Sequence, residues 1–487
     1  MTGAGAGAFA AVDLGATSGR VVLGRVGPGE LELHHVARFP NGPVALRDGL
    51  HWNVVELYRG VLDGLAAAVR AEPGIRSVGI DAWAVDYALL RGGRMLGLPF
   101  HYRDERRNAA GPAAVHARVG AAELYGRNGL QHLPFNTVFQ LACDAADGVL
   151  DAADTLLLVP DLLGFQLTGA AVAERTNAST TGLLDARTRE WDVELAGRLD
   201  IAAGILPPLV DPGTALGAIS GDALAAVGAP LPVVAVGSHD TASAVVAIPS
   251  VRDDVAYISC GTWALVGVEL DEPVLTDAAR AASFTNEGGV DGRVRFLHNV
   301  MGLWLLSESI RSWLGPGATT AQQSSALQEL LAQAAAAPAS VPVFDVDDPR
   351  FLAPGDMPAR IAGWLAEHDL PVPVDRPLMV RCIVESLAEA FARTVRRAAE
   401  LSGRAVATIH LVGGGAQNAL LCQAAADRAG LPLVAGPVEA TAIGNLLVQA
   451  RAAGVLSGSL ESLRALVAAT QHPVVYTPRR REERVHG

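Results

Sequence analysis

The sequence shows the same order of secondary-structure signals twice, once in each half of the chain. Each half opens with three short runs of β-branched and small apolar residues joined by glycine-containing turns, and helix-like and strand-like segments then alternate. Such alternation is typical of α/β layers in which helices cover both faces of each sheet. The sequence therefore predicts an α/β protein of two domains, residues 1–248 and 249–487. The strand-like runs are residues 9–15, 20–26 and 30–39, and then 254–261, 262–270 and 292–298.

Periodicity and helix-end residues predict the remaining elements. Asn136 and Asp161 each precede a helical pattern and are predicted to cap helices. Residues 75–86 are predicted to form one buried strand, and the helix beginning at residue 439 is predicted to be the last. Further helices are predicted over 54–71 and 381–403 and from residues 300 and 418, with strands over 155–160, 408–414 and 431–436.

Length and charge restrict the class of partner. A chain of 487 residues is too long for a single ordinary core. Its 38 basic and 51 acidic residues give a net charge of −13, which argues against nucleic acid or an anionic membrane as the main partner. A small-molecule ligand fits better, and the sequence leaves the oligomeric state, monomer or homodimer, open.

Several features predict a cytoplasmic protein. The first nineteen residues contain no Lys or Arg, whereas a signal peptide begins with a positively charged region. No stretch approaches eighteen apolar residues without Gly, Pro or a charge, so no membrane span is predicted. The cysteines lie far apart and form no C-x-x-C pair, so reduced thiols are expected rather than a disulfide framework. They are Cys143, Cys260, Cys382 and Cys422.

Two strand–turn–strand motifs have the composition of phosphate-binding turns. In AVDLGATSGR a strand ends at Asp13, and a turn containing Gly15 leads to the next strand. The N–H groups and hydroxyls of such a turn suit phosphate oxygens, and the carboxylate suits Mg²⁺ held through water, although an ordinary hairpin is the alternative. SCGTWALVG repeats the layout, so the pair predicts a phosphate chain bound from both sides. The phosphate-binding residues predicted from the two turns are Thr17, Ser18, Gly19, Arg20 and Thr262, with Asp13 as the magnesium ligand.

A third motif, IHLVGGGAQNALL, places a glycine loop between a strand and a helix. It resembles a dinucleotide-binding fingerprint, but Asn418 replaces the third glycine and the candidate acid, Glu439, comes after the next strand. The loop equally suits close approach of a base or ribose to the backbone. Gly414, Gly415 and Asn418 are therefore predicted nucleotide contacts, and a nicotinamide-dependent oxidoreductase is the alternative from another class.

Asp240 follows the apolar run VVAVGSH directly. A carboxylate at the C-terminal end of a buried strand lies where α/β folds bind their ligands. The same stretch, SHDTAS, also starts a helical pattern, so Ser238 or Asp240 is equally a candidate helix cap. The local sequence does not separate these two interpretations.

Polar residues interrupt other apolar runs. DAWAVDY places two acids around a tryptophan, as is common where a sugar ring meets an aromatic face, and this marks Trp83 and Asp86. Four segments with Asn or Thr are individually typical of caps and turns, and together predict amides that bind hydroxyls. H-E-x-x-H, P-loop and G-x-S-x-G motifs do not occur in the sequence. The four segments are residues 133–137, 175–180, 284–289 and 298–306.

Taken together, the motifs resemble those of the FGGY family of carbohydrate kinases. The similarity extends from about residue 9 to about residue 450. It implies the actin-like ATPase fold of hexokinase type, with two ribonuclease-H-like domains around a central cleft. The stretches that carry it are AVDLGATSGR, GIDAWAVDYALL, LPFNT, SHDTASAV, SCGTWALVG, TNEGG, NVMGLWLL, LVGGGAQNALL and AGPVEATAIGN.

The resemblance implies an activity and residue roles. The motifs are most similar to those of family members that use ATP and Mg²⁺ to convert L-rhamnulose to L-rhamnulose 1-phosphate. Kinases for L-fuculose, L-ribulose or L-xylulose are the alternatives. Asp240 falls at the position of the general base. The first domain would bind the sugar and contribute one phosphate-binding turn, Ala16–Arg20, and the second domain would contribute the other turn, with Thr262, and bind the adenosine. Sugar-contacting positions fall on Ala84, His239, Thr241 and Asn299, beside Trp83 and Asp86.

Two residues depart from the family pattern. Family members that act on L-rhamnulose usually have glycine where this chain has Ala84, so the extra methyl is expected to affect sugar specificity. Ser307 stands where a longer polar side chain near ATP is common, and it is the predicted ATP contact at that position. A non-catalytic sugar sensor of the same fold is a further alternative, against which the intact Asp240 argues.

Overall fold

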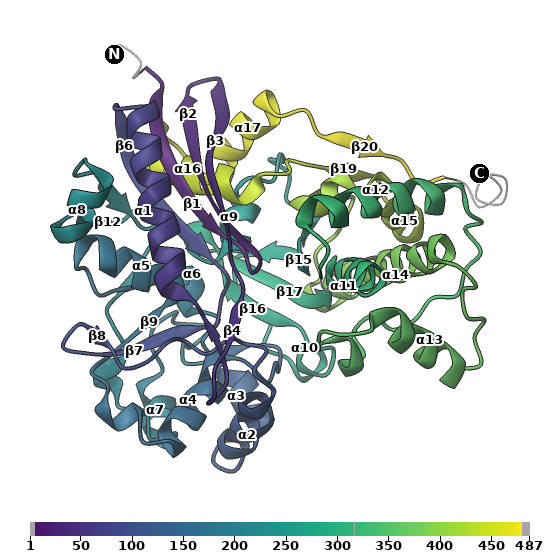
Figure 1. Ribbon diagram of the computed structural model, residues 1–487, viewed down its shortest axis with the longest axis horizontal. Coiled ribbons are helices and arrows are strands. Elements are labelled where there is room, and N and C mark those ends of the chain that lie inside the picture. The colour runs from purple at the N-terminus through teal and green to yellow at the C-terminus, as the bar shows by residue number, and fades with distance from the viewer. Residues whose placement is uncertain (1–4, 316, 480–487) are drawn as a thin grey trace. The chain divides into compact units, whose positions relative to one another are not determined.

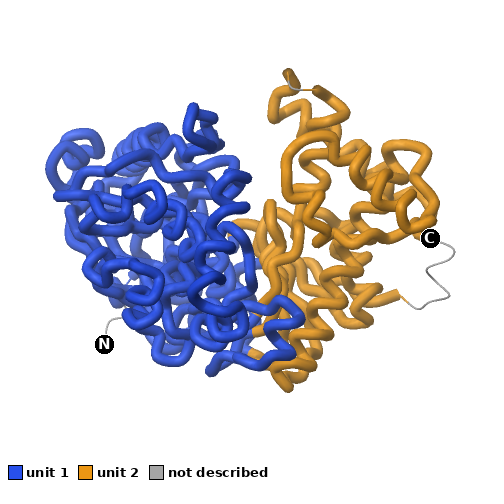
Figure 2. Tube along the Cα trace, turned by 90° about the horizontal axis from the view of Figure 1, so that it is seen from below, with its two compact units in different colours: residues 1–251, 269–296, 440–471 blue, residues 252–268, 297–439, 472–487 orange. Residues whose placement is uncertain are grey.

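A computed structural model describes residues 5–315 and 317–479 (Figure 1). The chain forms two compact units (Figure 2). Unit 1 comprises Met1–Val251, Glu269–Phe296 and Ala440–Gln471, and unit 2 comprises Arg252–Val268, Leu297–Glu439 and His472–Gly487. The compact units are therefore not the two halves of the chain, because two later segments pack in unit 1.

A six-stranded sheet forms the centre of unit 1, in the order β12-β13-β6-β1-β2-β3. Strand β1 pairs antiparallel with β2 and parallel with β6. Nearly every residue of β1 is buried, as its continuous apolar sequence predicts. The strands are β1 (Gly7–Leu14), β2 (Ser18–Gly27), β3 (Glu30–Pro40), β6 (Ile75–Ala82), β12 (Ala215–Ala218) and β13 (Pro232–Val234).

Helices cover the two faces of this sheet. Val21 packs against Gly64 of α1 (Val54–Ala71), whereas Gly24 of the same strand packs against Leu446 of α16 (Ala440–Ala452). Side chains at odd and even positions of a strand point to opposite faces, so α1 and α16 lie on opposite sides. Arg20 lies four residues before Gly24 on β2 and therefore on the same face of the sheet. Asp13 of β1 is paired with Arg20, so the side chains of Asp13 and Arg20 both point toward α16.

A second apolar cluster of unit 1 lies around a three-stranded sheet, β8-β7-β9. Its helices come from the middle of the first half of the chain, and α4 and α5 lie in the two segments with a predicted helical pattern. The elements are β7 (Tyr87–Arg91), β8 (Arg94–Met95), β9 (Thr155–Leu158), α2 (Glu105–His116), α3 (Ala121–Asn128), α4 (Thr137–Ala146), α5 (Val159–Thr168) and α7 (Val193–Arg198). The remaining elements of unit 1 are β4 (Pro43–Ala45), β5 (Leu50–Trp52), β10 (Ala173–Glu174), α6 (Arg175–Ala178), β11 (Leu209–Val210), α8 (Gly221–Val227), α9 (Asp240–Val246), α10 (Asp277–Ala281), β16 (Thr285–Gly288) and α17 (Leu460–Thr470).

In unit 2, which includes β15 up to Val268 and β17 from Leu297, the strand order is β17-β15-β14-β18-β19-β20. Strand β14 pairs antiparallel with β15 and parallel with β18, which is the pattern of β1 with β2 and β6. The structure thus confirms the repeated element order. The strands are β14 (Val255–Cys260), β15 (Trp263–Leu270), β17 (Val294–Met301), β18 (Thr408–Val412), β19 (Leu433–Ala435) and β20 (Val474–Tyr476); the helices are α11 (Trp304–Leu314), α12 (Thr320–Ala336), α13 (Met357–Glu367), α14 (Arg376–Ser402) and α15 (Ala419–Ala429).

Of the two predicted caps, the position of Asn136 is confirmed and that of Asp161 is wrong. Asn136 is the N-cap residue of α4, but its side chain does not bond to the helix and instead donates to the Gln131 carbonyl at 3.0 Å. Asp161 lies inside α5, which begins at Val159 because Pro160, with fixed φ and no N–H, suits the first turn.

Three predicted boundaries also shift. Strand β6 ends at Ala82 rather than at residue 86, because Val85 takes a left-handed conformation with φ of 67°. Strand β17 continues to Met301, so the helix predicted from residue 300 begins at Trp304. The helix predicted from residue 439 is α16, but α17 and β20 follow it.

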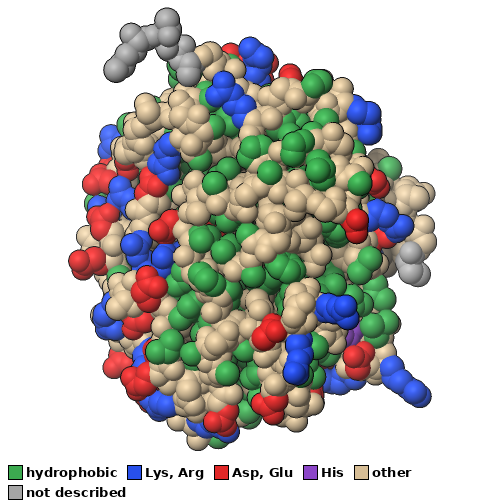
Figure 3. All heavy atoms as spheres, turned by 90° about the vertical axis from the view of Figure 1, so that its left-hand side faces the viewer, with side chains coloured by type: hydrophobic (Ala, Val, Ile, Leu, Met, Phe, Trp, Pro, Cys, Tyr) green, Lys and Arg blue, Asp and Glu red, His purple; other side chains and the backbone are tan. Residues whose placement is uncertain are grey.

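The surface shown in Figure 3 carries basic and acidic side chains side by side around its edge, with neutral and apolar groups in the middle. Charges on this face are therefore interspersed rather than gathered into one basic patch. None of the helices in the described part of the chain is long and apolar enough to cross a membrane.

Candidate active site

Asp240 is the first residue of α9 and follows the strand-like run 233–237. His239 occupies the N-cap position, and neither Ser238 nor Asp240 caps the helix with its side chain. The capping interpretation is therefore wrong. One third of the Asp240 side chain is exposed, and its Oδ1 accepts a hydrogen bond of 3.0 Å from the Thr241 hydroxyl.

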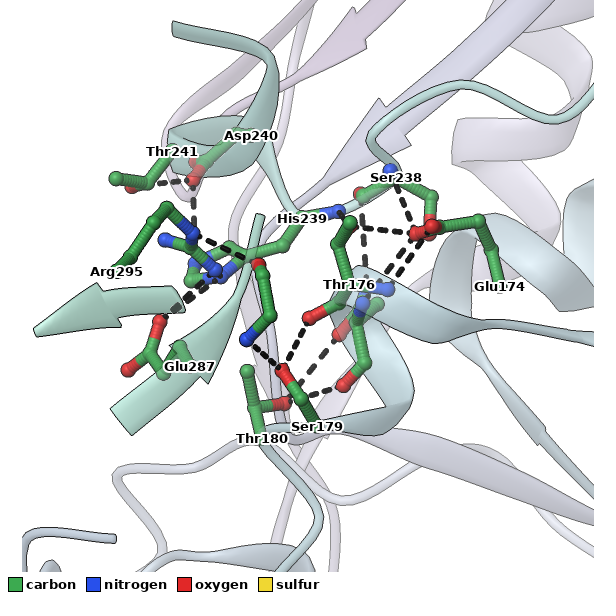
Figure 4. Close-up of polar contacts among 12 residues, drawn as sticks. Glu174, Thr176, Ser179, Thr180, Ser238, His239, Asp240, Thr241, Glu287 and Arg295 are labelled. Atoms are coloured by element: carbon green, nitrogen blue, oxygen red, sulfur yellow. Dashed lines mark hydrogen bonds and ion pairs between the residues drawn. The ribbon is translucent and has the colours of Figure 1, made fainter. Parts of the chain in front are cut away.

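The loop before Asp240 is held on two sides, and Figure 4 shows the side on which Ser238 contacts Glu174. The Ala82 N–H at the end of β6 donates to the Ser238 carbonyl at 2.9 Å. The backbone N–H and the hydroxyl of Ser238 both donate to Oε2 of Glu174, at 2.9 and 2.8 Å. Because Glu174 is almost fully buried, this anchor fixes the backbone immediately before His239 and Asp240.

Glu174 also caps α6, in the segment RTNAST. Its carboxylate accepts from the N–H groups of Thr176 and Asn177 and from the Thr176 hydroxyl. Burial raises its pKa, and these hydrogen bonds oppose the rise. The segment acts here as a capped turn that supports the loop carrying Asp240.

His239 lies in a buried group of charged residues from unit 1 (Figure 4). Nδ1 of His239 lies 3.0 Å from a guanidinium nitrogen of Arg295 and 3.3 Å from Oε2 of Glu287. Nε2, on the other side of the ring, lies 3.5 Å from Oδ1 of Asp240. Burial raises the pKa of Glu287, but Arg295 and His239 outweigh that effect and lower it. A charged side chain thus supports each side of the imidazole.

Asp13 and Asp81 stand at the ends of neighbouring strands on the side of Asp240. The two occupy paired positions of β1 and β6. Burial raises the pKa of Asp81 well above its usual range, and the charges of Asp13 and Asp240 raise it further. Asn445 of α16 donates to Asp81 Oδ2 at 2.6 Å, whereas Oδ1 is buried without a hydrogen-bond partner.

The β1–β2 turn, residues 15–19, is closed by hydrogen bonds. The Gly15 N–H donates to the Ser18 carbonyl at 3.0 Å, and the Asn41 amide donates to the Gly15 carbonyl at 2.8 Å. Thr17 is exposed at the tip. Arg20 donates to Asp13 Oδ2 from two nitrogens, at 2.9 and 2.7 Å, so the predicted cation is paired with the predicted magnesium ligand.

Asp86 is fully buried beneath two tryptophans. Its Oδ2 accepts from the indole nitrogens of Trp52 and Trp83, at 2.5 and 3.1 Å, and Oδ1 accepts from Gln140 at 2.9 Å. Burial raises the pKa of Asp86 to about 7. Because its carboxylate is enclosed by donors, Asp86 orients the tryptophans rather than presenting a free carboxylate.

A tight turn links this cluster to β6. The Asp86 N–H donates to the Ala84 carbonyl at 2.9 Å, two residues earlier, so Val85 is the centre of a γ-turn. A positive φ is a true outlier for a β-branched residue, and such a conformation persists only where the surroundings hold it. Thr137 does so by donating to the Val85 carbonyl at 2.6 Å.

In unit 2, Thr262 lies in the β14–β15 turn. The Gly261 N–H donates to the Trp263 carbonyl at 2.8 Å. Gly302 packs directly on this turn, where a Cβ would lie 2.6 Å from the Trp263 carbonyl carbon. The start of α11 therefore fixes the turn.

The loop GGGAQN forms a 3₁₀ turn, Gly414–Gln417, before α15. Gly415 packs on Cys260, where a Cβ would lie 2.5 Å from Sγ, whereas Gly414 faces open space. Asn418 caps α15 by accepting from the Leu421 N–H at 3.1 Å. Burial raises the pKa of Cys260, as expected for a core thiol.

The remaining predicted residues also lie in unit 2. Asn299 is partly buried on β17, and Ser307 is exposed on α11. The predicted set thus divides between the units. Unit 1 holds Asp13, Ala16, Thr17, Ser18, Gly19, Arg20, Trp83, Ala84, Asp86, His239, Asp240 and Thr241; unit 2 holds Thr262, Asn299, Ser307, Gly414, Gly415 and Asn418.

Several residues around Asp240 were not predicted. Asp81 had a usable signal, since an acid ends each of two strands that become parallel neighbours. The others lie far from residue 240 in sequence and meet it only in the fold. They are Glu174, Glu287, Arg295 and Asn445. Across the described residues, no group of three or more His, Cys, Asp or Glu side chains is arranged to bind a metal directly.

Family models cover most of the chain. The N-terminal domain of the FGGY family of carbohydrate kinases matches residues 9–247, and the C-terminal domain matches residues 256–453. A rhamnulokinase of Bacteroides thetaiotaomicron is 40% identical over 451 residues, which are 92% of this chain and 91% of that protein. A rhamnulokinase of Enterococcus faecalis is 41% identical over 456 residues, which are 92% and 90% of the two chains.

Solved structures share the fold at low sequence identity. Gluconate kinase from Lactobacillus acidophilus superposes with a TM-score of 0.78 at 16% identity, over 99% of this chain and 95% of that one. Glycerol kinase from Plasmodium falciparum, solved with ADP, superposes with a TM-score of 0.75 at 15% identity, over 99% and 96%. These matches identify the actin-like ATPase fold expected from the sequence.

Proposed function

The chain belongs to the FGGY family of carbohydrate kinases, and from that premise we propose that it transfers the γ-phosphate of ATP to the C1 hydroxyl of L-rhamnulose. The products are L-rhamnulose 1-phosphate and ADP. One observation carries the choice of sugar: rhamnulokinases of several bacteria are about 40% identical to this chain over more than nine-tenths of its length.

Asp240 is the proposed general base. Its carboxylate accepts the proton of the C1 hydroxyl while that oxygen attacks the γ-phosphorus and the bond to ADP breaks. A positioned base of this kind accelerates a reaction by about 10²–10⁴-fold. Two features support the assignment: the side chain is partly exposed, and Glu174 anchors the preceding loop through Ser238.

Mg²⁺ fits the carboxylates at the ends of β1 and β6. Asp81 has a buried oxygen without a hydrogen-bond partner, and Asp13 lies beside it in register. Carboxylate oxygens and water are the ligands that Mg²⁺ prefers. We propose that Asp13 holds the ion through water, with Asp81 as its neighbour; the bound ion would neutralise phosphate charge.

We propose the remaining roles by position. The first domain, residues 1–248, binds the sugar and contributes one phosphate-binding turn. The second domain, residues 249–487, contributes the other phosphate-binding turn and the adenosine contacts. Asp86 acts on the sugar through Trp83 and Trp52, which it orients. The two phosphate-binding turns are Ala16–Arg20 and the turn that contains Thr262. The adenosine and ATP contacts are Gly414, Gly415, Asn418 and Ser307, and the sugar contacts are Trp83, Ala84, His239, Thr241 and Asn299.

A coupled ADP-release assay with a panel of ketoses tests this proposal. L-rhamnulose should give the highest kcat/KM, above L-fuculose, L-ribulose and L-xylulose. Equal turnover of all four would refute the sugar assignment and leave the family unaffected. Stabilisation against heat by NAD but not by ATP with Mg²⁺ would refute the kinase proposal itself.

A further inference from the structure

We propose that Arg295 and His239 position the general base: Arg295 fixes the tautomer of His239, and the His239 Nε2–H then orients the Asp240 carboxylate. The inference rests on the proposed function, because it takes Asp240 as the base. It assigns Arg295 a role through His239 and not through contact with substrate.

Arg295 is the first component. Its side chain is fully buried, in the strand β17 (Figure 4). Nε donates to the Gly288 carbonyl at 2.9 Å, which fixes the plane of the guanidinium. One terminal nitrogen then lies 3.0 Å from Nδ1 of His239, with its hydrogen directed at the ring. A guanidinium donates and does not accept, so Nδ1 must be the acceptor.

The tautomer follows from this contact. A neutral imidazole carries one hydrogen, and an accepting Nδ1 leaves that hydrogen on Nε2. Nε2 faces Oδ1 of Asp240 at 3.5 Å. The Thr241 hydroxyl donates a hydrogen bond of 3.0 Å to the same oxygen. Oδ1 thus accepts from Thr241 and is approached by Nε2, which leaves Oδ2 as the oxygen that accepts the substrate proton.

Glu287 balances the charge of Arg295. Its Oε2 lies 3.1 Å from the guanidinium nitrogen that reaches His239. This pairing allows Arg295 to remain buried beside His239 without forcing a net positive charge on the site. Glu287 also favours the competing tautomer of His239, in which a hydrogen on Nδ1 would point at Oε2 of Glu287, 3.3 Å away.

The tautomer can be measured without any turnover. Long-range ¹H–¹⁵N spectra of the intact wild-type protein distinguish Nδ1–H from Nε2–H in histidine, and His239→Gln identifies the signal. We expect the Nε2–H form for His239. A dominant Nδ1–H form would overturn the inference. Because no sugar or nucleotide is required, this result is independent of whether L-rhamnulose is the substrate.

Kinetics of Arg295 variants test the consequence for Asp240. Arg295→Met should lower kcat by at least about tenfold while the KM for ATP stays unchanged, since a misoriented imidazole no longer holds the base. Arg295→Lys keeps a donor and should recover part of kcat. Arg293→Met is the matched control, because Arg293 pairs with Glu461 and Asp271 near the surface, and it should leave kcat unchanged.

The outcomes separate the inference from the proposed function. Wild-type protein inactive on every ketose would refute the proposed function, while the tautomer measurement would still decide the His239 arrangement. Equal kcat in wild type and folded Arg295→Met would overturn the positioning role. Loss of kcat in Arg295→Met with no recovery in a folded Arg295→Lys would also overturn it, because a donor at Nδ1 would then not suffice.

Discussion

Asp13 and Asp81 stand side by side, at paired positions of the parallel strands β1 and β6. Burial raises the pKa of Asp81 well above its usual range, and the charge of Asp13 raises it further, because neighbouring carboxylates do not both ionise readily. Asn445 approaches from α16 and donates to Asp81, while Gln449, one turn later, donates to Asn445 at 2.6 Å. This buried chain links α16, in the segment 440–471, to β6 within unit 1.

Two substitutions of Asp81 distinguish the loss of its ionisable group from the loss of its hydrogen-bond acceptor. Asp81→Asn should change the free energy of unfolding by less than about 1 kcal/mol, because an amide oxygen can still accept from Asn445. Asp81→Leu should cost about 1–3 kcal/mol, because the Asn445 amide would then be buried without a partner. Urea unfolding measures both, and equal destabilisation by the two variants would contradict the account.

Packing of α9 against α16 should tolerate no added atom at Gly444. A Cβ there would lie 1.8 Å from the Ser243 carbonyl oxygen. Gly444→Ala should therefore destabilise by at least about 1–3 kcal/mol through overpacking. Gly197→Ala is the control, because a Cβ at this helical position meets nothing within 4 Å and should stabilise by about 0.5–1 kcal/mol. Thermal melting compares them, and similar melting temperatures would refute the close approach.

Asp86 predicts a pH dependence of stability. Its pKa in the folded protein, about 7, lies above the ordinary value of 3.8, so the folded state binds the proton more tightly. The resulting stabilisation is complete below pH 3.8 and is lost as the pH rises through 7. Asp86→Asn cannot titrate, so the stability difference, wild type minus variant, should fall by about 2 kcal/mol between pH 5 and pH 8. A difference that stays constant or grows with pH would contradict the assignment.

Ala84 predicts an effect on sugar choice. Its extra methyl lies in the turn that carries Trp83, before the strained Val85. Ala84→Gly restores the residue that family members acting on L-rhamnulose usually have, so it should raise the ratio of kcat/KM for L-rhamnulose over L-fuculose by about tenfold, the scale on which one methyl group discriminates. The same panel assay measures the ratio, and an unchanged ratio would show that the methyl does not face the sugar.

Elements with strong local signals could be predicted from the sequence. Helix α1 has the predicted bounds, Val54–Ala71, because its apolar face has clear periodicity. The three opening strands of each half were also recognisable. The prediction failed where a tertiary contact decides the boundary: Thr137 holds the strained Val85 that ends β6 early, and Gly302 on the Thr262 turn delays α11.

The site was predictable only in part for the same reason. Asp13 and Asp240 end apolar runs, which is a local signal. Glu174 and Arg295 lie 66 and 55 positions from Asp240 in the sequence and reach its loop only through the tertiary fold. Local sequence could not show that Glu174 anchors Ser238 or that Arg295 faces His239.

Product analysis with purified protein tests the central claim most directly. Incubation with L-rhamnulose, ATP and Mg²⁺ should give a sugar phosphate whose ³¹P signal couples to the C1 protons, with one ADP formed per sugar. Asp240→Asn should form it about 10²–10⁴-fold more slowly while remaining folded. Phosphate at another carbon, or near wild-type rates in Asp240→Asn, would contradict the account.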